Sequence, residues 1–239
     1  MNLNCDTGER GLNLVDIELV KIVDEVNVAC GGHTGDEKTI RFYCELAIKH
    51  NTKINAHISY PDKENFGRHR MDISDEDLIK SINEQYNNIS KYTKSVKFHG
   101  ALYNVACSDA NIGKLLAQWC VYTGITSVVT LYDGQLSIYC KMYGINVVGE
   151  FFAERNYTLS KNGSAVLVDR KNLYASIHNV NAAIAHSKYF ISDKKVNAVI
   201  PFGDGFKYEQ VPVVADTICI HSDSEIALPL AKELRKVLK

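Results

Sequence analysis

Four histidines in this 239-residue chain stand at or just after the ends of short apolar runs of strand-like composition. Imidazole titrates near neutral pH, so these side chains could transfer protons during catalysis or bind a divalent metal ion. One histidine at a strand end is most often a structural residue, but four in equivalent places predict that most of the group is functional. They are His33, His57, His99 and His221.

Acidic, basic and amide side chains occur in the same segments as these histidines. Asp6 follows the first apolar run, Glu9 lies shortly beyond it, Asp36 follows the second run, and Lys97 lies in the fourth. Carboxylates in such positions could act as general acids or bases, and lysine or arginine could bind anionic groups. The other polar candidates in these segments are Tyr103, Asn104, Glu154 and Arg155.

Glycines flank two of the histidines. Gly31-Gly32 and Gly35 surround His33, and Gly100 follows His99. Glycine lets the backbone approach a ligand and present its amide groups, but ordinary strand-to-helix turns favour glycine as well. The sequence contains neither G-x-x-x-x-G-K-[ST] nor G-x-G-x-x-G between a strand and a helix, so it shows no standard nucleotide site.

A charged segment, Pro61–Arg70, follows the third apolar run. Its length and its proline and glycine residues fit a lid or substrate clamp, in which Arg68 and Arg70 could hold a carboxylate through paired hydrogen bonds. A solvated surface loop is equally compatible with this composition.

The candidate residues require a scaffold that brings strand ends together. Short strand-like runs alternate with amphipathic helical stretches, which predicts a mainly parallel sheet covered by helices. Helices are expected to begin at Asp36, at the capping-box-like Ser74–Asp77 and at Asp223-Ser224, and a hairpin is expected within Val196–Val211. The seven expected strands are Leu3–Cys5, Val26–Cys30, Lys53–His57, Val96–His99, Ser127–Leu131, Val147–Phe152 and Thr217–His221.

Around seven strand–helix units in one chain fit a closed or nearly closed barrel better than an open five-stranded sheet. We therefore predict an α/β fold, a TIM-like barrel of seven or so strands, forming a single domain over residues 1–239. Such barrels carry their active sites at the carboxyl ends of the strands, so the histidines and Asp6 are expected to converge on one mouth.

The composition argues against several classes of partner. The net charge is −1, and the lysines and arginines are spread along the chain, so no basic face for nucleic acid or an anionic membrane is expected. The N-terminus lacks the pattern of a signal peptide, no apolar stretch approaches the length of a membrane span, and the seven cysteines are scattered without a Cys-x-x-Cys pair. These features predict a cytoplasmic protein with reduced thiols.

Six segments that contain these candidates resemble the LamB/YcsF family, in the family's order and over nearly the whole chain. The sequence has His33-Thr34-Gly35-Asp36 where the family usually reads H-A-G-D, and His221-Ser222-Asp223 where it usually reads H-G-D; the family's S-R motif is represented by Asp169-Arg170. The matching segments are Leu3–Glu9, Asn27–Asp36, Ala56–Asp62 with Phe66–Arg68, Lys97–Asn104, Glu150–Tyr157 and Asp216–His221.

The resemblance implies a barrel similar to that of the polysaccharide deacetylases, and a reaction in which 5-oxo-L-proline is opened to L-glutamate while ATP is cleaved to ADP and phosphate. It also implies that the chain works as an A subunit with separate B and C subunits. The catalytic group would be Asp6, His33, His57, Lys97, His99 and Glu154. Substrate would be bound by Glu9, Asp36, Arg68, Tyr103, Asn104, Arg155 and His221.

Two other functions remain open at this point. The chain could be a metal-dependent amide hydrolase or deacetylase that acts alone, with a divalent ion bound by Asp6, His33, His57 and His99. It could instead be a scaffold without catalytic activity for partner subunits. Within the leading hypothesis, Asp6 or a histidine is the candidate general base, Lys97 and Arg68 would bind phosphorylated or carboxylate groups, and Glu154 and Arg155 would orient their partners.

Overall fold

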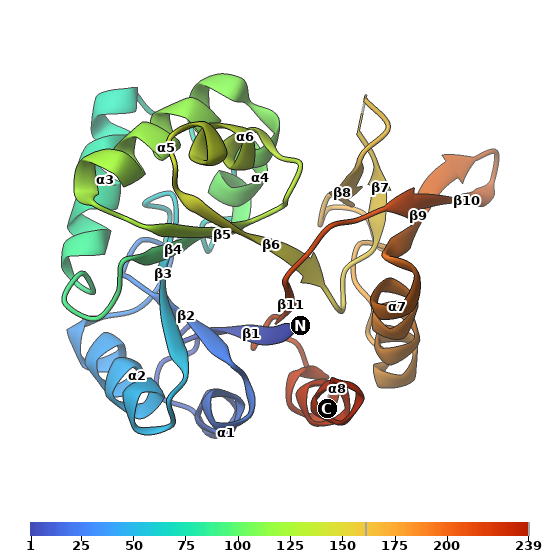
Figure 1. Cartoon of the computed structure of the whole chain (residues 1–239), viewed down its shortest axis with the longest axis horizontal. Coiled ribbons are helices and arrows are strands. Elements are labelled where there is room, and N and C mark those ends of the chain that lie inside the picture. Colours follow the sequence, from blue (N-terminus) through green and yellow to red (C-terminus); the bar gives the residue numbers. More distant parts are fainter. Residues whose placement is uncertain (161, 239) are drawn as a thin grey trace.

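Seven parallel strands close into a barrel in the computed structural model, which describes residues 1–160 and 162–238. The ring runs β1-β2-β3-β4-β5-β6-β11 and closes where β1 pairs with both β2 and β11 (Figure 1). This arrangement is a TIM-like barrel, as predicted. The strands are β1 (Asn2–Thr7), β2 (Glu25–Ala29), β3 (Lys53–Ile58), β4 (Ser95–Phe98), β5 (Ser127–Thr130), β6 (Asn146–Phe152) and β11 (Thr217–Ile220).

Helices cover the outside of the ring (Figure 1). Because the barrel strands are packed between these helices and their own inward side chains, nearly all of their residues are buried, which explains their Val- and Ile-rich sequences. The helices are α1 (Leu14–Ile22), α2 (Glu37–Lys49), α3 (Asp75–Asn87), α4 (Gly100–Ser108), α5 (Ala110–Thr123), α6 (Gln135–Met142), α7 (Val180–Asp193) and α8 (Ala227–Val237).

One long excursion separates β6 from β11. It contains the small antiparallel pair β7 (Tyr157–Leu159) and β8 (Ala165–Leu167), then α7, then the hairpin of β9 (Lys195–Phe202) and β10 (Gly205–Pro212). The β9–β10 hairpin extends away from the barrel on the right of Figure 1. This hairpin confirms the one predicted within Val196–Val211, whereas β7 and β8 were not predicted because each has only three residues.

Most predicted strands and helix starts lie within one or two residues of the observed ones. Asp36 caps α2 with a full capping box to Thr39, and the Ser74 hydroxyl accepts the amide of Asp77 at the start of α3. The predicted start of the last helix at Asp223-Ser224 is wrong, since α8 begins at Ala227. Asp223 instead pairs with Arg68 on the other side of the barrel mouth. None of the described helices is long and apolar enough to cross a membrane.

Gly100 marks a place where the loop after β3 packs against the start of α4. Its φ is +56°, and a Cβ atom added there would lie 2.5 Å from the carbonyl oxygen of Gly67. That same oxygen accepts the amide of Ala101 at 2.9 Å. The absence of a side chain at Gly100 therefore allows the loop to close onto the barrel mouth.

Replacing Gly100 by alanine should destabilise the protein by about 1–3 kcal/mol more than the same change at Gly124, because overpacking is added to the cost of a positive φ. Gly124 is a matched control, with a φ of +71° and no atom within 4 Å of an added Cβ. Urea unfolding of Gly100→Ala and Gly124→Ala would measure the difference. Equal midpoints would contradict the close packing.

Candidate active site

Alternate residues of the barrel strands point into the barrel and carry polar side chains to its carboxyl-end mouth. Asp6 on β1, His57 on β3, Lys97 on β4, Glu150 on β6 and Cys219 on β11 are all buried there. Successive residues of a strand point to opposite faces of the sheet, so every second side chain of a strand points into the barrel. The barrel thus gathers ionisable groups from five strands in one place.

Lys97 is the charge at the centre of this group. Its Nζ lies 3.0 Å from Asp6 Oδ1, 2.8 Å from Glu150 Oε1 and 3.0 Å from Cys219 Sγ. Burial disfavours the charged amine, but the negative charges of Asp6 and Glu150 and the neighbouring Cys219 raise the pKa of Lys97 well above its ordinary value of 10.5. Lys97 is therefore a permanent buried cation.

Asp6 is ionised for the reciprocal reason. Burial alone would raise its pKa, but the charges of His57 and Lys97 hold the pKa of Asp6 well below its ordinary value of 3.8. Burial raises the pKa of the Cys219 thiol well above 9.0, so this group remains protonated beside Lys97.

A ladder of buried amides supports Asp6 from inside the barrel. Asn55 Nδ2 donates to Asn27 Oδ1 at 3.0 Å, and Asn27 Nδ2 donates both to Asn4 Oδ1 at 2.8 Å and to Asp6 Oδ1 at 2.9 Å. Asn4 continues the ladder to the hydroxyl of Thr217. The hydrogen bond from Asn27 to Oδ1 fixes the orientation of the Asp6 carboxylate. Its other oxygen, Oδ2, therefore faces His57 and lies 3.5 Å from His57 Nε2.

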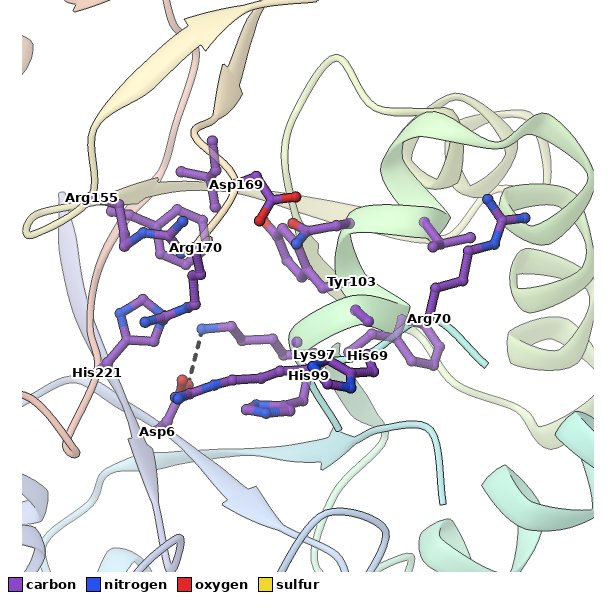
Figure 2. A pocket seen from close by; sticks show the side chains of 18 of the residues that line it. Asp6, His69, Arg70, Lys97, His99, Tyr103, Arg155, Asp169, Arg170 and His221 are labelled. Atoms are coloured by element: carbon purple, nitrogen blue, oxygen red, sulfur yellow. Dashed lines mark hydrogen bonds and ion pairs between the residues drawn. The ribbon is translucent and has the colours of Figure 1, made fainter. Parts of the chain in front are cut away.

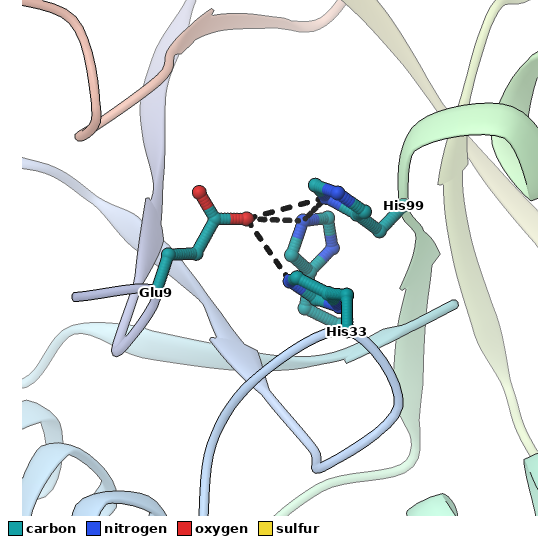
Figure 3. A group of neighbouring side chains, drawn as sticks. Glu9, His33 and His99 are labelled. Atoms are coloured by element: carbon teal, nitrogen blue, oxygen red, sulfur yellow. Dashed lines mark hydrogen bonds and ion pairs between the residues drawn. The ribbon is translucent and has the colours of Figure 1, made fainter. Parts of the chain in front are cut away.

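Three histidines meet at one carboxylate oxygen, Glu9 Oε1 (Figure 3). This oxygen lies 3.1 Å from His33 Nε2, 3.2 Å from His99 Nδ1 and 3.6 Å from His57 Nε2. The His33 and His99 rings are stacked, with centroids 3.7 Å apart and planes 2° from parallel. We call Glu9, His33, His57 and His99 the histidine cluster.

The histidine cluster carries its positive charge on His57. Burial acts to lower the pKa of His57, but the charge of Asp6 and hydrogen bonds to Asp6 and Glu9 raise it to about 9. Burial lowers the pKa of His33 to about 3 and also lowers that of His99. For Glu9, burial is outweighed by hydrogen bonds from the three histidines, which hold its pKa well below 4.5.

Two groups of side chains could each supply ligands to a metal ion. Glu9, His33, His57 and His99 offer ligand atoms that all lie within 4.8 Å of one another. Asp6, Cys219 and His221 form a second such group. The first group differs from the predicted ligand set by having Glu9 in place of Asp6, because the nearest cation to Asp6 is the amine of Lys97.

A cavity of about 850 Å³ opens above these side chains (Figure 2). Asp6, His57, His99 and Lys97 line its polar end, and its rim carries cationic side chains. The Tyr103 hydroxyl is buried without a hydrogen-bond partner among the described residues, and Tyr103 lines the same cavity. The basic residues of the lining also include Arg68, His69, Arg70, Arg155, Arg170 and Lys171.

This arrangement combines ionised carboxylates, imidazoles and cations around a cavity large enough for a small anionic molecule. The sequence model of the LamB/YcsF family matches residues 1–239. The chain belongs to the LamB/YcsF family.

Named relatives match over the full chain. A protein from Oceanobacillus iheyensis that is named as the A subunit of 5-oxoprolinase is 34% identical over 251 residues, which cover 100% of this chain and 93% of the relative. A protein of the same name from Staphylococcus aureus is 33% identical over 250 residues, with 100% and 95% coverage. The crystal structure of the lactam utilization protein from Thermus thermophilus superposes with a TM-score of 0.82 and 29% identity, covering 100% of this chain and 95% of the other.

The LamB/YcsF chain brings most of the residues predicted from its sequence to this mouth. Nine of the thirteen line the cavity, and His33 and Glu9 lie directly behind it in the histidine cluster. Glu154 also lies behind the lining, where its Oε1 accepts both the backbone amide and the Nδ1 of His221 at 2.6 Å. The nine are Asp6, His57, Arg68, Lys97, His99, Tyr103, Asn104, Arg155 and His221.

Three predicted binding residues have other partners in the structure. Asp36 does not line the cavity; its carboxylate caps α2, so the geometry does not support its predicted role in substrate binding. Arg155 uses its guanidinium to donate to the carbonyls of Ala175 and Val168, which anchors the β7–β8 excursion. Arg68 is paired with Asp223 at 2.5 Å, which leaves only part of its guanidinium for a ligand.

The predicted lid segment packs on the histidine cluster. The carbonyl of Phe66 accepts a hydrogen bond from His99 Nε2 at 3.0 Å, and the Phe66 ring makes edge contacts with His33 and His99. Arg70 lines the cavity, but its guanidinium is paired with Asp109. The segment thus shields the histidines from solvent on one side.

Several site residues had not been assigned a role from the sequence. Arg170 lines the cavity, although the sequence shows it only as one half of a family motif. Glu150 and Cys219 complete the surroundings of Lys97. Each lies at an inward-facing position of a predicted strand. A strand that is buried on both faces is apolar throughout, however, so its sequence does not distinguish the inner face from the outer face.

Replacing Lys97 by methionine should lower the free energy of unfolding by about 3–5 kcal/mol, because it leaves Asp6 and Glu150 as buried carboxylates without their cation. Lys21→Met is the matched control: its partner Glu18 is on the surface, and the side chains are 38% and 46% exposed. That change should cost less than about 1 kcal/mol. Similar urea midpoints for the two variants would contradict the central role of Lys97.

Proposed function

We propose that this chain is the A subunit of an ATP-dependent 5-oxoprolinase, which hydrolyses the lactam of 5-oxo-L-proline to L-glutamate as ATP is cleaved to ADP and phosphate. The observation that carries the proposal is the cavity itself. Its lining combines an ionised carboxylate, imidazoles and a buried cation with several arginines. The names of the full-length relatives and of the Thermus structure point to the same chemistry.

The chemistry of the substrate explains why such a site is needed. A lactam is a stable amide that water attacks slowly, and phosphorylation of its carbonyl oxygen would make the carbon electrophilic. Water would then add to that carbon, the C–N bond would break as the ring nitrogen takes a proton, and a second water would hydrolyse the resulting acyl phosphate to L-glutamate and phosphate. The site must therefore position a water, move protons and stabilise negative charge.

The residues of the mouth fit these tasks. Asp6 and His57 form a carboxylate–imidazole pair at the cavity floor, with the carboxylate held by Asn27 and Lys97. The Asp6 carboxylate would accept the proton of the attacking water, and the protonated His57 would donate one to the nitrogen. Lys97 would stabilise the negative charge of the phosphoryl group on the carbonyl oxygen, and Arg170 on the rim would bind the substrate carboxylate or a phosphoryl group.

ATP and partner subunits belong to this proposal as well. The sequence contains no standard phosphate-binding loop. A chain that supplies the hydrolytic mouth while B and C subunits supply further functions is consistent with the names of the relatives. We propose that the complex works in the cytoplasm on a small-molecule substrate.

A metal-dependent amide hydrolase or deacetylase acting alone is the second candidate function, and the histidine cluster is the observation that favours it. The two functions differ in what they require. The first needs ATP and partner chains, whereas the second needs neither.

Reconstitution with candidate B and C proteins tests the first proposal. The three chains together should release phosphate in a manner that depends on 5-oxoproline, with one L-glutamate formed for each phosphate. Omitting this chain or ATP should abolish glutamate formation. Lactam or amide hydrolysis by this chain alone without ATP would favour the second function, and no turnover by an assembled complex would contradict the first.

A further inference from the structure

The orientation of two histidine rings in the histidine cluster is fixed by backbone carbonyls. His57 Nδ1 lies 3.2 Å from the carbonyl oxygen of Lys97, and His99 Nε2 lies 3.0 Å from that of Phe66. A carbonyl oxygen can only accept, so each of these nitrogens carries a proton. When its ring is neutral, the other nitrogen presents a lone pair, which a metal ion would bind in place of the proton that Asp6 and Glu9 favour on His57.

These two nitrogens face each other. His57 Nε2 and His99 Nδ1 are 3.0 Å apart, and the ionised Glu9 Oε1 lies 3.6 Å and 3.2 Å from them. All three side chains are at least 95% buried, so water cannot screen the repulsion between these electron-rich atoms. Such an arrangement requires a positive charge among these atoms, which is either the proton on His57 or a metal ion.

The spacing is close to the geometry of a metal ion. Nitrogen and oxygen ligands at 2.0–2.2 Å in a tetrahedron are separated from one another by roughly 3.3–3.6 Å. The three observed separations are 3.0, 3.2 and 3.6 Å. The His33 ring is stacked parallel to that of His99, so an ion in the plane of the His99 ring would lie outside the plane of the His33 ring; His33 Nε2 instead contacts Glu9 Oε1 at 3.1 Å.

The outer contacts also fit a metal site. Ligating histidines usually donate their second ring N–H to a carbonyl or carboxylate, which fixes the ring and its tautomer. His57 and His99 both do so through backbone carbonyls. We propose that Glu9, His57 and His99 bind a divalent transition-metal ion of the zinc type.

The position of this ion gives it access to the substrate cavity. His57 and His99 line the cavity, whereas Glu9 holds the ion from behind. On the proposed lactam function, the ion would take the place of the proton on His57 and supply a Lewis acid beside Asp6. The binding site itself does not depend on that function, because it follows from the three side chains alone.

Metal binding by the isolated chain tests the proposal without substrate or partners. After removal of metals by chelation, the chain should bind one equivalent of Zn²⁺, measured by elemental analysis after gel filtration. Co²⁺ should bind at the same site and give visible d–d absorption, which Zn²⁺ should displace. Glu9→Gln and His99→Ala should each weaken Co²⁺ binding by at least about 100-fold, beyond the usual effect of losing an outer contact.

His178→Ala is the matched control, because His178 is exposed and lies outside the cluster; it should bind Co²⁺ as the parent chain does. Absence of stoichiometric Zn²⁺ and Co²⁺ binding by the folded parent chain would overturn the proposal, and the positive charge would then be a proton shared by His57 and His99. Unchanged binding by both cluster variants would overturn it as well, by placing any ion elsewhere. Neither result would affect the reconstitution assay of the proposed function, so the two proposals fail separately.

Discussion

The burial of one lysine among carboxylates is the interaction on which the mouth of this barrel depends. Lys97 reaches across the barrel from β4 to Asp6 on β1 and Glu150 on β6, so three strands share a single buried cation. Two buried carboxylates this close would otherwise repel each other, and one would be protonated. Because Lys97 keeps Asp6 ionised, Asp6 in turn can hold a positive charge on His57 by raising the pKa of that imidazole.

Charge compensation then extends outward in layers. The asparagine ladder donates a hydrogen bond to one oxygen of Asp6, and the three histidines surround Glu9 beside it. The loop after β3 closes over the histidines through the carbonyl of Phe66, and this closure is possible because Gly100 has no side chain. The catalytic groups are thus held by buried contacts, and the cationic rim is more open to solvent.

Much of this arrangement follows from the sequence. The alternation of apolar runs with amphipathic helices predicts the barrel, and strand ends in a parallel barrel must meet at one mouth, so His57, His99 and Asp6 could be placed together. What could not be predicted is the pairing of particular side chains. Glu9, and not the expected Asp6, lies among the three histidines, because a turn at Gly8, with a φ of +79°, redirects the chain after β1. Nor does the sequence reveal that Asp223 pairs with Arg68.

Glutamate formation from 5-oxoproline by a reconstituted complex that contains Asp6→Asn is the most direct test of the proposed chemistry. The substitution keeps the size of the side chain but removes the charge that Lys97, Asn27 and His57 surround. We expect the rate to fall by at least about 100-fold while the complex still assembles, with His178→Ala unchanged. A full rate with Asp6→Asn would show that the chemistry takes place elsewhere.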